Sequence, residues 1–149
     1  MHSLKELAKD GMLGKVYITM HAERVAELLG EPDYKGGGSR KHKWENIFRY
    51  GSFELGFEIK SRELNYFAIN FAQEFEKAKA LEYDLWILSP NLRSSEFESL
   101  CKSQEVEFKQ FDEPWNEGCI EYLTEGGMHL CFDENDRLTK FVVSDGEYS

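Results

Sequence analysis

The clearest indication of the fold is the stretch IFRYGSFELGFEI, residues 47–59, which predicts a β-hairpin. Apolar residues alternate with other residues up to Gly51-Ser52 and alternate again after it, which is typical of two antiparallel strands joined by a two-residue turn. Such a turn places Tyr50 opposite Phe53, so that the apolar side chains share one face. They are Phe48, Tyr50, Phe53, Leu55 and Phe57. Because a one-residue slip would turn this face to water, the register is well specified.

A second hairpin is predicted from residues 120–124 and 128–132. A three-residue loop at residues 125–127, Glu-Gly-Gly, keeps the apolar residues of both strands on one face. A two-residue Gly-Gly turn would mix the two faces instead. A glycine in the left-handed conformation beside a bulge suits the longer loop.

Helices and further strands are predicted around the two hairpins. Apolar residues at helical spacing predict helices over residues 3–10, 20–29 and 92–102. Gly11 and Gly30 stand where the first two helices should end. Either Asn91 or Ser94 could be the N-cap of the third helix. Alternating apolar residues predict strands over residues 65–71, 81–88, 106–111 and 137–143.

The order of these elements repeats along the chain. Neither half is expected to bury the apolar face of its sheet alone, so the halves should share a layer. The predicted fold class is α+β: a tandem repeat of a helix followed by an antiparallel β-meander, with the helices packed on one face of an antiparallel sheet. One domain, residues 1–149, would consist of two similar halves at about residues 12–72 and 81–143. The alternative is a chance similarity between amphipathic segments.

Composition narrows the compartment and the class of protein. The chain of 149 residues is 41% hydrophobic, which is ample for a packed core. It contains no apolar run long enough for a transmembrane helix, and its charged amino terminus lacks the apolar stretch of a signal peptide. We therefore expect a cytoplasmic protein. Three cysteines without C-x-x-C spacing argue against a disulfide framework or a structural zinc site.

Charge is spread unevenly along the chain. Residues 101–149 carry 4 Lys/Arg and 12 Asp/Glu, which accounts for most of the net charge of −10. An acidic half disfavours nucleic-acid binding and favours either a basic protein partner or a simple solubilising role. Residues 34–43 form a glycine-rich loop with the opposite sign, containing Lys35, Arg40, Lys41 and Lys43. This loop lacks the phosphate-binding motif, so it is interpreted as a mobile loop.

Candidate catalytic groups are few. His129 and Cys131 lie on one face of a predicted strand, opposite the core, but they supply only two of the ligands that a metal site needs. As a Cys–His pair they lack a third, orienting group. His21 and Glu23 are two residues apart on a helix and do not face each other. We therefore expect no catalytic residues, no metal site and no cofactor.

A binding surface is the stronger prediction. Acidic residues crowd Trp115 and Pro114 in residues 112–118, and an aromatic residue among carboxylates is typical of a hot spot for a basic partner. Alternatively, Trp115 could fold back onto the core beneath a solvated loop. The predicted partner-binding residues are Asp112, Glu113, Trp115, Glu117, Glu121, Glu125, Asp133, Glu134 and Asp136.

Part of the chain resembles a known group of proteins. Residues 18–33, ITMHAERVAELLGEPD, are similar to the helix and Leu-Gly-x-Pro signature of β-lactamase inhibitor proteins and small outer-membrane assembly lipoproteins. The wider pattern of LLGEPD, FRYGSFELGFE, LEYDLWILSP and GGMHLCFDENDRLTKF resembles small bacterial proteins that include immunity proteins of toxin systems. This resemblance implies a helix-on-sheet tandem repeat and, in the inhibitor branch, binding to a protein through the sheet. The chain departs from it by lacking a lipoprotein signal and by having His21 where such helices often begin with Ser or Thr.

These observations lead to one main hypothesis and two alternatives. The main hypothesis is a small acidic cytoplasmic immunity protein of a bacterium, which inhibits a cognate toxin domain, such as a basic nuclease, by occluding its active site. One alternative is a protein-interaction module of the same fold without a toxin. The other is an enzyme that acts on a small molecule through His21, His129 or Cys131. The sequence does not define the oligomeric state.

Overall fold

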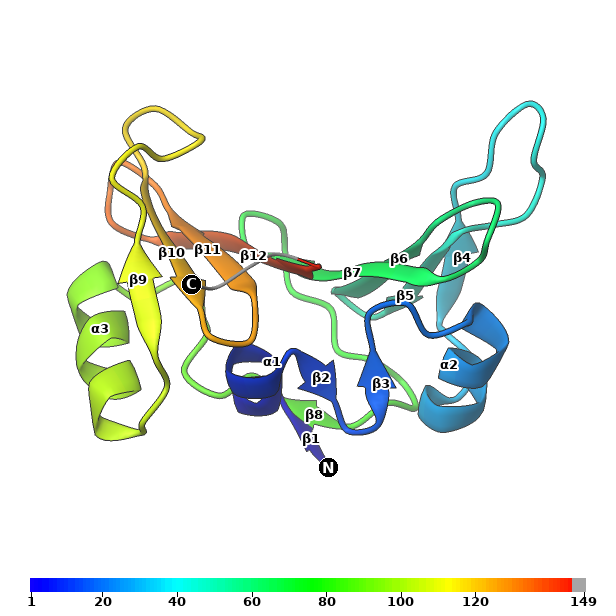
Figure 1. Cartoon of the computed structure of the whole chain (residues 1–149), viewed down its shortest axis with the longest axis horizontal. Helices are drawn as coiled ribbons and strands as arrows, with labels where there is room; N and C mark the ends of the chain where they lie inside the picture. Colours follow the sequence, from blue (N-terminus) through cyan, green and yellow to red (C-terminus); the bar gives the residue numbers. More distant parts are fainter. Residues whose placement is uncertain (146–149) are drawn as a thin grey trace.

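The centre of the computed structural model, which describes residues 1–145, is an eight-stranded antiparallel sheet (Figure 1). One half of the sheet consists of β4 (Tyr34–Gly36), β5 (Ile47–Tyr50), β6 (Phe53–Phe57) and β7 (Leu64–Asn70). The other half consists of β12 (Leu138–Ser144), β11 (Met128–Phe132), β10 (Ile120–Thr124) and β9 (Phe108–Gln110). The halves meet where β7 pairs with β12, and β4 and β9 are the edges.

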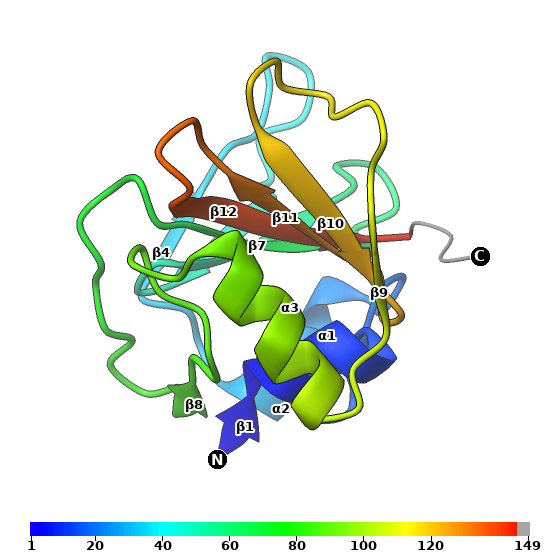
Figure 2. The same ribbon diagram turned by 90° about the vertical axis from the view of Figure 1, so that its left-hand side faces the viewer.

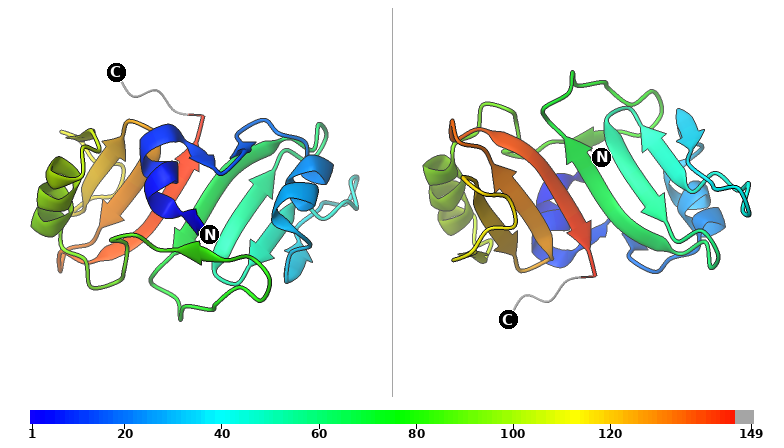
Figure 3. Two further views of the ribbon diagram at one scale, coloured as in Figure 1. Left: turned by 90° about the horizontal axis from the view of Figure 1, so that it is seen from below. Right: turned by 90° about the horizontal axis from the view of Figure 1, so that it is seen from above.

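Helices lie on one side of this sheet. They are α1 (Leu4–Asp10), α2 (Ala22–Leu29) and α3 (Ser94–Ser103). Two small sheets accompany them, one pairing β1 (His2–Ser3) with β8 (Tyr83–Asp84) and one pairing β2 (Met12–Leu13) with β3 (Val16–Tyr17). Figure 2 shows α3, α1 and α2 below the sheet, and Figure 3 shows the opposite face with no helix in front of it. We call this second face the open face. The α+β class predicted from the sequence is confirmed.

The first hairpin forms as predicted. Tyr50 pairs with Phe53 and Phe48 with Leu55 across a turn at Gly51-Ser52. Gly51 has a φ of +61°, and a Cβ there would lie 2.3 Å from the carbonyl oxygen of Glu76. The turn therefore requires glycine both for its backbone conformation and for the close passage of the segment that follows β7.

The second hairpin has the predicted three-residue loop. β10 ends at Thr124 and β11 begins at Met128, which leaves residues 125–127 as the connection. Its Gly126 packs directly on α1: the Gly126 N–H donates to the carbonyl oxygen of Ala8 over 2.9 Å. The hydroxyl of Thr124 donates to the same oxygen over 2.6 Å. The second hairpin is thus joined to the amino-terminal helix.

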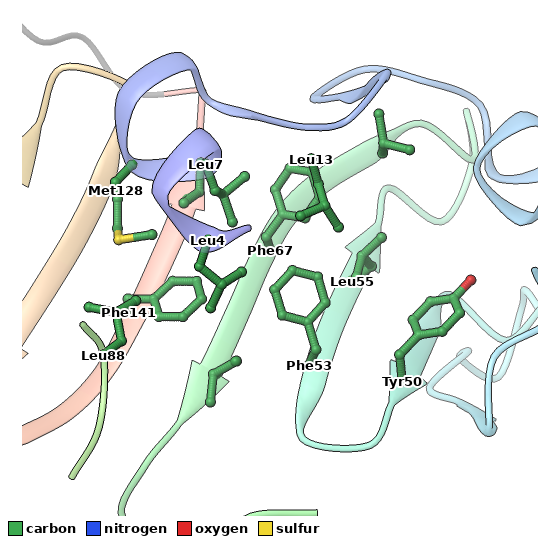
Figure 4. Packing of buried hydrophobic residues seen from close by; sticks show 14 of the residues in the cluster. Leu4, Leu7, Leu13, Tyr50, Phe53, Leu55, Phe67, Leu88, Met128 and Phe141 are labelled. Atoms are coloured by element: carbon green, nitrogen blue, oxygen red, sulfur yellow. The ribbon is translucent and has the colours of Figure 1, made fainter. Parts of the chain in front are cut away.

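The hydrophobic core lies between the helices and the sheet. Figure 4 shows Leu4 and Leu7 of α1 next to Phe67 and Phe141, which come from the two halves of the sheet. Each of these side chains is fully buried, and burying one such group stabilises the fold by roughly 1.5–3 kcal/mol. α1 therefore covers the line along which the two halves meet.

Two predictions about local structure are wrong. Residues 81–88 do not form one strand, because the Asp84 carboxylate accepts the N–H of Trp86 and the chain turns there, leaving only the two residues of β8. The N-cap of α3 is Arg93, not Asn91 or Ser94. Its place is set by carboxylates: Glu96 accepts the Arg93 N–H over 3.1 Å, and Asp136 accepts the Ser94 N–H over 3.0 Å.

Candidate functional site

The candidate site lies on the open face of the sheet over β10 and β11. Glu121 pairs with Cys131 in the register of these strands, and His129 lies on the same face, two residues before Cys131. Their neighbours Tyr122, Leu130 and Phe132 point the other way, into the core. The prediction that His129 and Cys131 share a face opposite the core is confirmed.

Residues 112–118, which we call the Trp115 loop, fold over this face and are fastened to it by Glu121. Figure 3 shows the segment crossing in front of β10 and β11 when the molecule is seen from above. The Glu121 carboxylate accepts the backbone N–H of Trp115 over 3.1 Å and that of Asn116 over 3.0 Å. It also accepts the Asn116 side-chain amide over 2.9 Å. Because hydrogen bonds to an ionised group are stronger than neutral ones, this contact fixes the shape of the loop.

The sheet supplies further partners for the same carboxylate. Nε2 of His129 lies 2.9 Å from one oxygen of Glu121, and the Sγ of Cys131 lies 3.7 Å from the other. We call Glu121, His129, Asn116 and the Trp115 backbone the Glu121 latch. Glu121 is 0% exposed, and burial alone would raise its pKa. The hydrogen bonds from Asn116, His129 and the Trp115 backbone outweigh burial and hold the pKa of this carboxyl below its ordinary value.

Trp115 is a surface residue. It is 78% exposed, and its indole stands edge-on to the His129 ring with 4.7 Å between the ring centroids. Phe111 completes this aromatic group at 5.1 Å from His129. The sequence left open whether Trp115 lies at the surface or folds back onto the core, and in the structure it lies at the surface.

The nine predicted partner-binding residues do not form one exposed surface. Asp112, Glu113 and Glu117 are exposed beside Trp115, and Glu134 is exposed next to Gly118. The prediction that Glu121 binds a partner is wrong, because its side chain is buried inside the latch and cannot contact a partner.

The other three acids of that set have roles within the fold. Glu125 lies at the far end of β10 and accepts the Glu107 N–H over 2.7 Å. Asp133 closes the turn after β11 through the N–H groups of Asn135 and Arg137. Asp136 caps α3. Among the predicted partner-binding residues, the exposed acids are therefore those of the Trp115 loop and Glu134.

The cysteine in this site is a poor nucleophile. Burial, followed by the nearby Cys119 thiol and the Glu121 charge, raises the pKa of Cys131 to about 11. At neutral pH its thiolate fraction is therefore very small, although a thiolate is the reactive form. Within residues 1–145, no three His, Cys, Asp or Glu side chains come together in a way that could hold a metal ion. What the contacts of Glu121 do is hold the Trp115 loop against the sheet.

Comparison with protein-family models, curated proteins and solved structures gives no match to this chain. In residues 1–145, none of the helices is both long enough and apolar enough to cross a membrane.

Proposed function

We propose that this chain is a binding protein that recognises a basic protein partner through the Trp115 loop. One observation carries the proposal: a 78% exposed tryptophan stands on a loop whose backbone is held by a buried carboxylate. Exposed tryptophan is costly in water and is enriched among the residues that dominate binding energy. A loop that is already ordered loses little conformational entropy when it binds, so more of the contact energy becomes affinity.

Charge around Trp115 indicates the sign of the partner. Asp112, Glu113 and Glu117 are exposed on the same loop, in the half of the chain that carries a net charge of −8 from 4 Lys/Arg and 12 Asp/Glu. Such a surface attracts a cationic partner over long range and repels anionic ones, nucleic acid included. The acids would set the rate and orientation of association, while Trp115 would supply the contact energy.

The particular form of this proposal is a bacterial immunity protein. It would bind its cognate toxin domain in the cytoplasm and occlude the active site, which suits a basic nuclease because such an active site attracts polyanions. The resemblance to inhibitor and immunity proteins supports this form. The strand order also supports the proposed tandem repeat, because β4-β5-β6-β7 and β9-β10-β11-β12 run inward from the two edges and α2 and α3 precede them.

The genetic context and a binding assay test the proposal together. A gene for a secreted protein with a carboxy-terminal toxin domain should lie directly upstream, and that domain should bind this chain in a pull-down. We expect Trp115→Ala to weaken binding by at least tenfold, the range of an interface hot spot at roughly 2 kcal/mol or more. Reversing Glu113 and Glu117 to Lys should weaken binding as well.

Matched variants separate binding from folding. Tyr34→Ala removes another exposed aromatic residue at the opposite edge of the sheet, and Glu45→Lys with Glu74→Lys makes the same change in charge elsewhere. These controls should bind like the unmodified chain. If Trp115→Ala binds normally and only lowers the melting temperature, the Trp115 loop is structural and the proposal is wrong. If the neighbouring gene encodes no toxin but the loop still binds another protein, the interaction module without a toxin replaces the immunity protein.

A further inference from the structure

A small hollow opens on the open face directly beside Trp115. Its volume is about 140 Å³. Trp115 and Asn116 of the Trp115 loop line it together with His129 and Cys131 of β11 and Val142 of β12. Lys140 and Ser144, both exposed, stand at its rim.

The volume selects the size of the occupant. Sites for whole small-molecule ligands usually measure about 300–1,000 Å³. An apolar cavity of about 150 Å³ holds one benzene molecule. The hollow of about 140 Å³ therefore matches a single six-membered ring and is too small for a typical metabolite.

The lining selects the chemistry of that ring. The two rings in the lining, Trp115 and His129, favour an aromatic occupant, because edge-to-face and offset contacts between rings add about 0.5–1.5 kcal/mol to the burial of their area. The Lys140 ammonium at the rim repels a cationic side chain and so favours a neutral occupant over lysine or arginine. Within residues 1–145, neither the Lys140 ammonium nor the Ser144 hydroxyl takes part in a side-chain hydrogen bond or ion pair. Both are available to a polar group at the end of the ring.

We propose that the hollow receives one tyrosine side chain of the protein partner. This proposal rests on the proposed function, because the partner is the same protein. The phenol ring would lie between Trp115 and Val142 with its hydroxyl at Lys140 and Ser144. The acids Asp112, Glu113 and Glu117 would meet cationic residues that flank this tyrosine. The partner's contact segment would thus carry a tyrosine flanked by basic residues. Its charge would complement the acidic residues that flank Trp115.

The first experiment needs no partner. p-Cresol, which is the tyrosine side chain, is titrated into the full chain and followed by two-dimensional NMR, with n-butylamine, the lysine side chain, as the matched cationic probe. We expect p-cresol to shift the signals of Trp115, His129 and Val142, and n-butylamine to leave them in place. If p-cresol leaves these signals unchanged, or if n-butylamine shifts them as much, the proposal is overturned.

The second experiment fills the hollow from inside. Val142→Phe places a ring into it, whereas Ala68→Phe adds the same ring on the adjacent strand, because Ala68 pairs with Val142 but does not line the hollow. Val142→Phe should abolish the p-cresol shifts and weaken binding of the toxin domain by roughly 10- to 150-fold, the loss expected for one buried aromatic side chain. Ala68→Phe should do neither. Should Val142→Phe fail to fold, Ser144→Phe at the exposed rim makes the same test.

The outcomes distinguish this proposal from the proposed function. If reversing Glu113 and Glu117 weakens binding while folded Val142→Phe or Ser144→Phe binds normally, the Trp115 loop is the interface but no side chain enters the hollow. If neither the charge reversal nor the added phenylalanine weakens binding, the Trp115 loop is not the interface, and the proposed function is wrong together with this proposal. If p-cresol binds in the hollow but the partner's affinity does not respond when its contact tyrosine is changed to Ala, the occupant is a free aromatic molecule and the proposal is wrong.

Discussion

Glu121 is the residue on which the candidate site depends. A buried carboxylate is stable only when hydrogen-bond donors surround it, and here the donors come from two elements that would otherwise be independent, the sheet and the Trp115 loop. The carboxylate therefore converts an acidic, proline-containing loop into a fixed support for Trp115. The charge of Glu121 stabilises the fold through its hydrogen bonds, whereas the side chains of Asp112, Glu113 and Glu117 are exposed to solvent.

Replacing this charge tests the latch. Glu121→Gln keeps the shape of the side chain but removes the negative charge, so we expect the free energy of unfolding at pH 7 to fall by about 2 kcal/mol, as for loss of a charged hydrogen bond. Because the folded pKa of Glu121 lies below its ordinary value, the stabilisation is present above about pH 4.3, the pKa of an unperturbed glutamate, and is lost as the pH falls through the lower folded pKa. Urea denaturation of both proteins between pH 3 and pH 7 measures the difference.

The exposed Glu117 provides the control. Glu117→Gln removes the same charge from the same loop and should change the free energy of unfolding by no more than about 0.5 kcal/mol, as is usual for surface changes. A difference between unmodified protein and Glu121→Gln that stays constant down to pH 3 would show that the carboxylate charge does not hold the loop.

For single residues, the sequence predicted which face of the sheet a side chain occupies, but not whether another segment covers that face. Alternation along β10 and β11 correctly places Glu121, His129 and Cys131 opposite the core. It also led to the interpretation of Glu121 as exposed, because one face of an antiparallel sheet is commonly in contact with water. The cover on that face comes from a polar loop held by hydrogen bonds, and hydrophobic periodicity carries no information about such a cover. Trp115 could not be placed for the same reason.

At the scale of elements, local chemistry decided which predictions succeeded. The hairpins at residues 47–59 and 120–132 were predictable because the turn residues and the alternation lie within a few positions of each other. The start of α3 was not, because the carboxylate that accepts its first N–H belongs to Asp136, 42 residues away. The strand expected at residues 81–88 failed where a single side chain, Asp84, accepts a backbone N–H and turns an apolar run.

The contact between the second hairpin and α1 makes a prediction at this scale. A Cβ added to Gly126 would lie 2.6 Å from the backbone nitrogen of Gly11 and from the carbonyl oxygen of Leu7. Backbone atoms cannot move aside cheaply, so Gly126→Ala should lower the free energy of unfolding by about 1–3 kcal/mol, the usual cost of overpacking. Thermal denaturation measures this change.

Gly36→Ala is the matched control for Gly126→Ala. A Cβ on Gly36 would also be crowded, but by the side chain of Tyr34, which is 57% exposed and free to rotate away. We expect it to cost much less. If Gly126→Ala costs as little as is expected for Gly36→Ala, then α1 and the second hairpin separate easily, contrary to the packing in the structure.

At the scale of the whole molecule, charge is arranged by sheet edge. The acidic Trp115 loop stands at the β9–β10 end, and the basic residues Arg40, Lys41 and Lys43 lie in the segment between β4 and β5 at the other end (Figure 1). This separation was visible in the sequence as an acidic half and a basic loop. Their positions at opposite ends follow only from the strand order, which sequence periodicity does not determine. The basic partner that we propose would therefore approach from the β9–β10 end of the sheet.

Ionic strength tests this arrangement. Because exposed charges are screened over about 8 Å at 0.15 M salt, association with the basic partner should slow as salt rises, while dissociation changes little. Reversing Glu113 and Glu117 to Lys should flatten the dependence of the association rate on salt. Trp115→Ala should lower affinity and keep the original slope, because it removes no charge. Stopped-flow or surface-plasmon kinetics at several salt concentrations give both rates. A salt-independent association rate for the unmodified chain would contradict electrostatic attraction.

The hydrogen bonds from Gly126 and Thr124 to Ala8 also determine when the chain can fold during its synthesis. They span 116 residues between Thr124 and Ala8, and α1 covers a core to which β12 contributes. While the ribosome is still making the first half, Leu4 and Leu7 have no complete site to enter, and the backbone of β7 has no second neighbour because β12 does not yet exist. Unpaired strand edges and uncovered leucines are the surfaces on which nascent chains aggregate. This architecture therefore delays closure of the core until β12 has left the ribosome and can pair with β7.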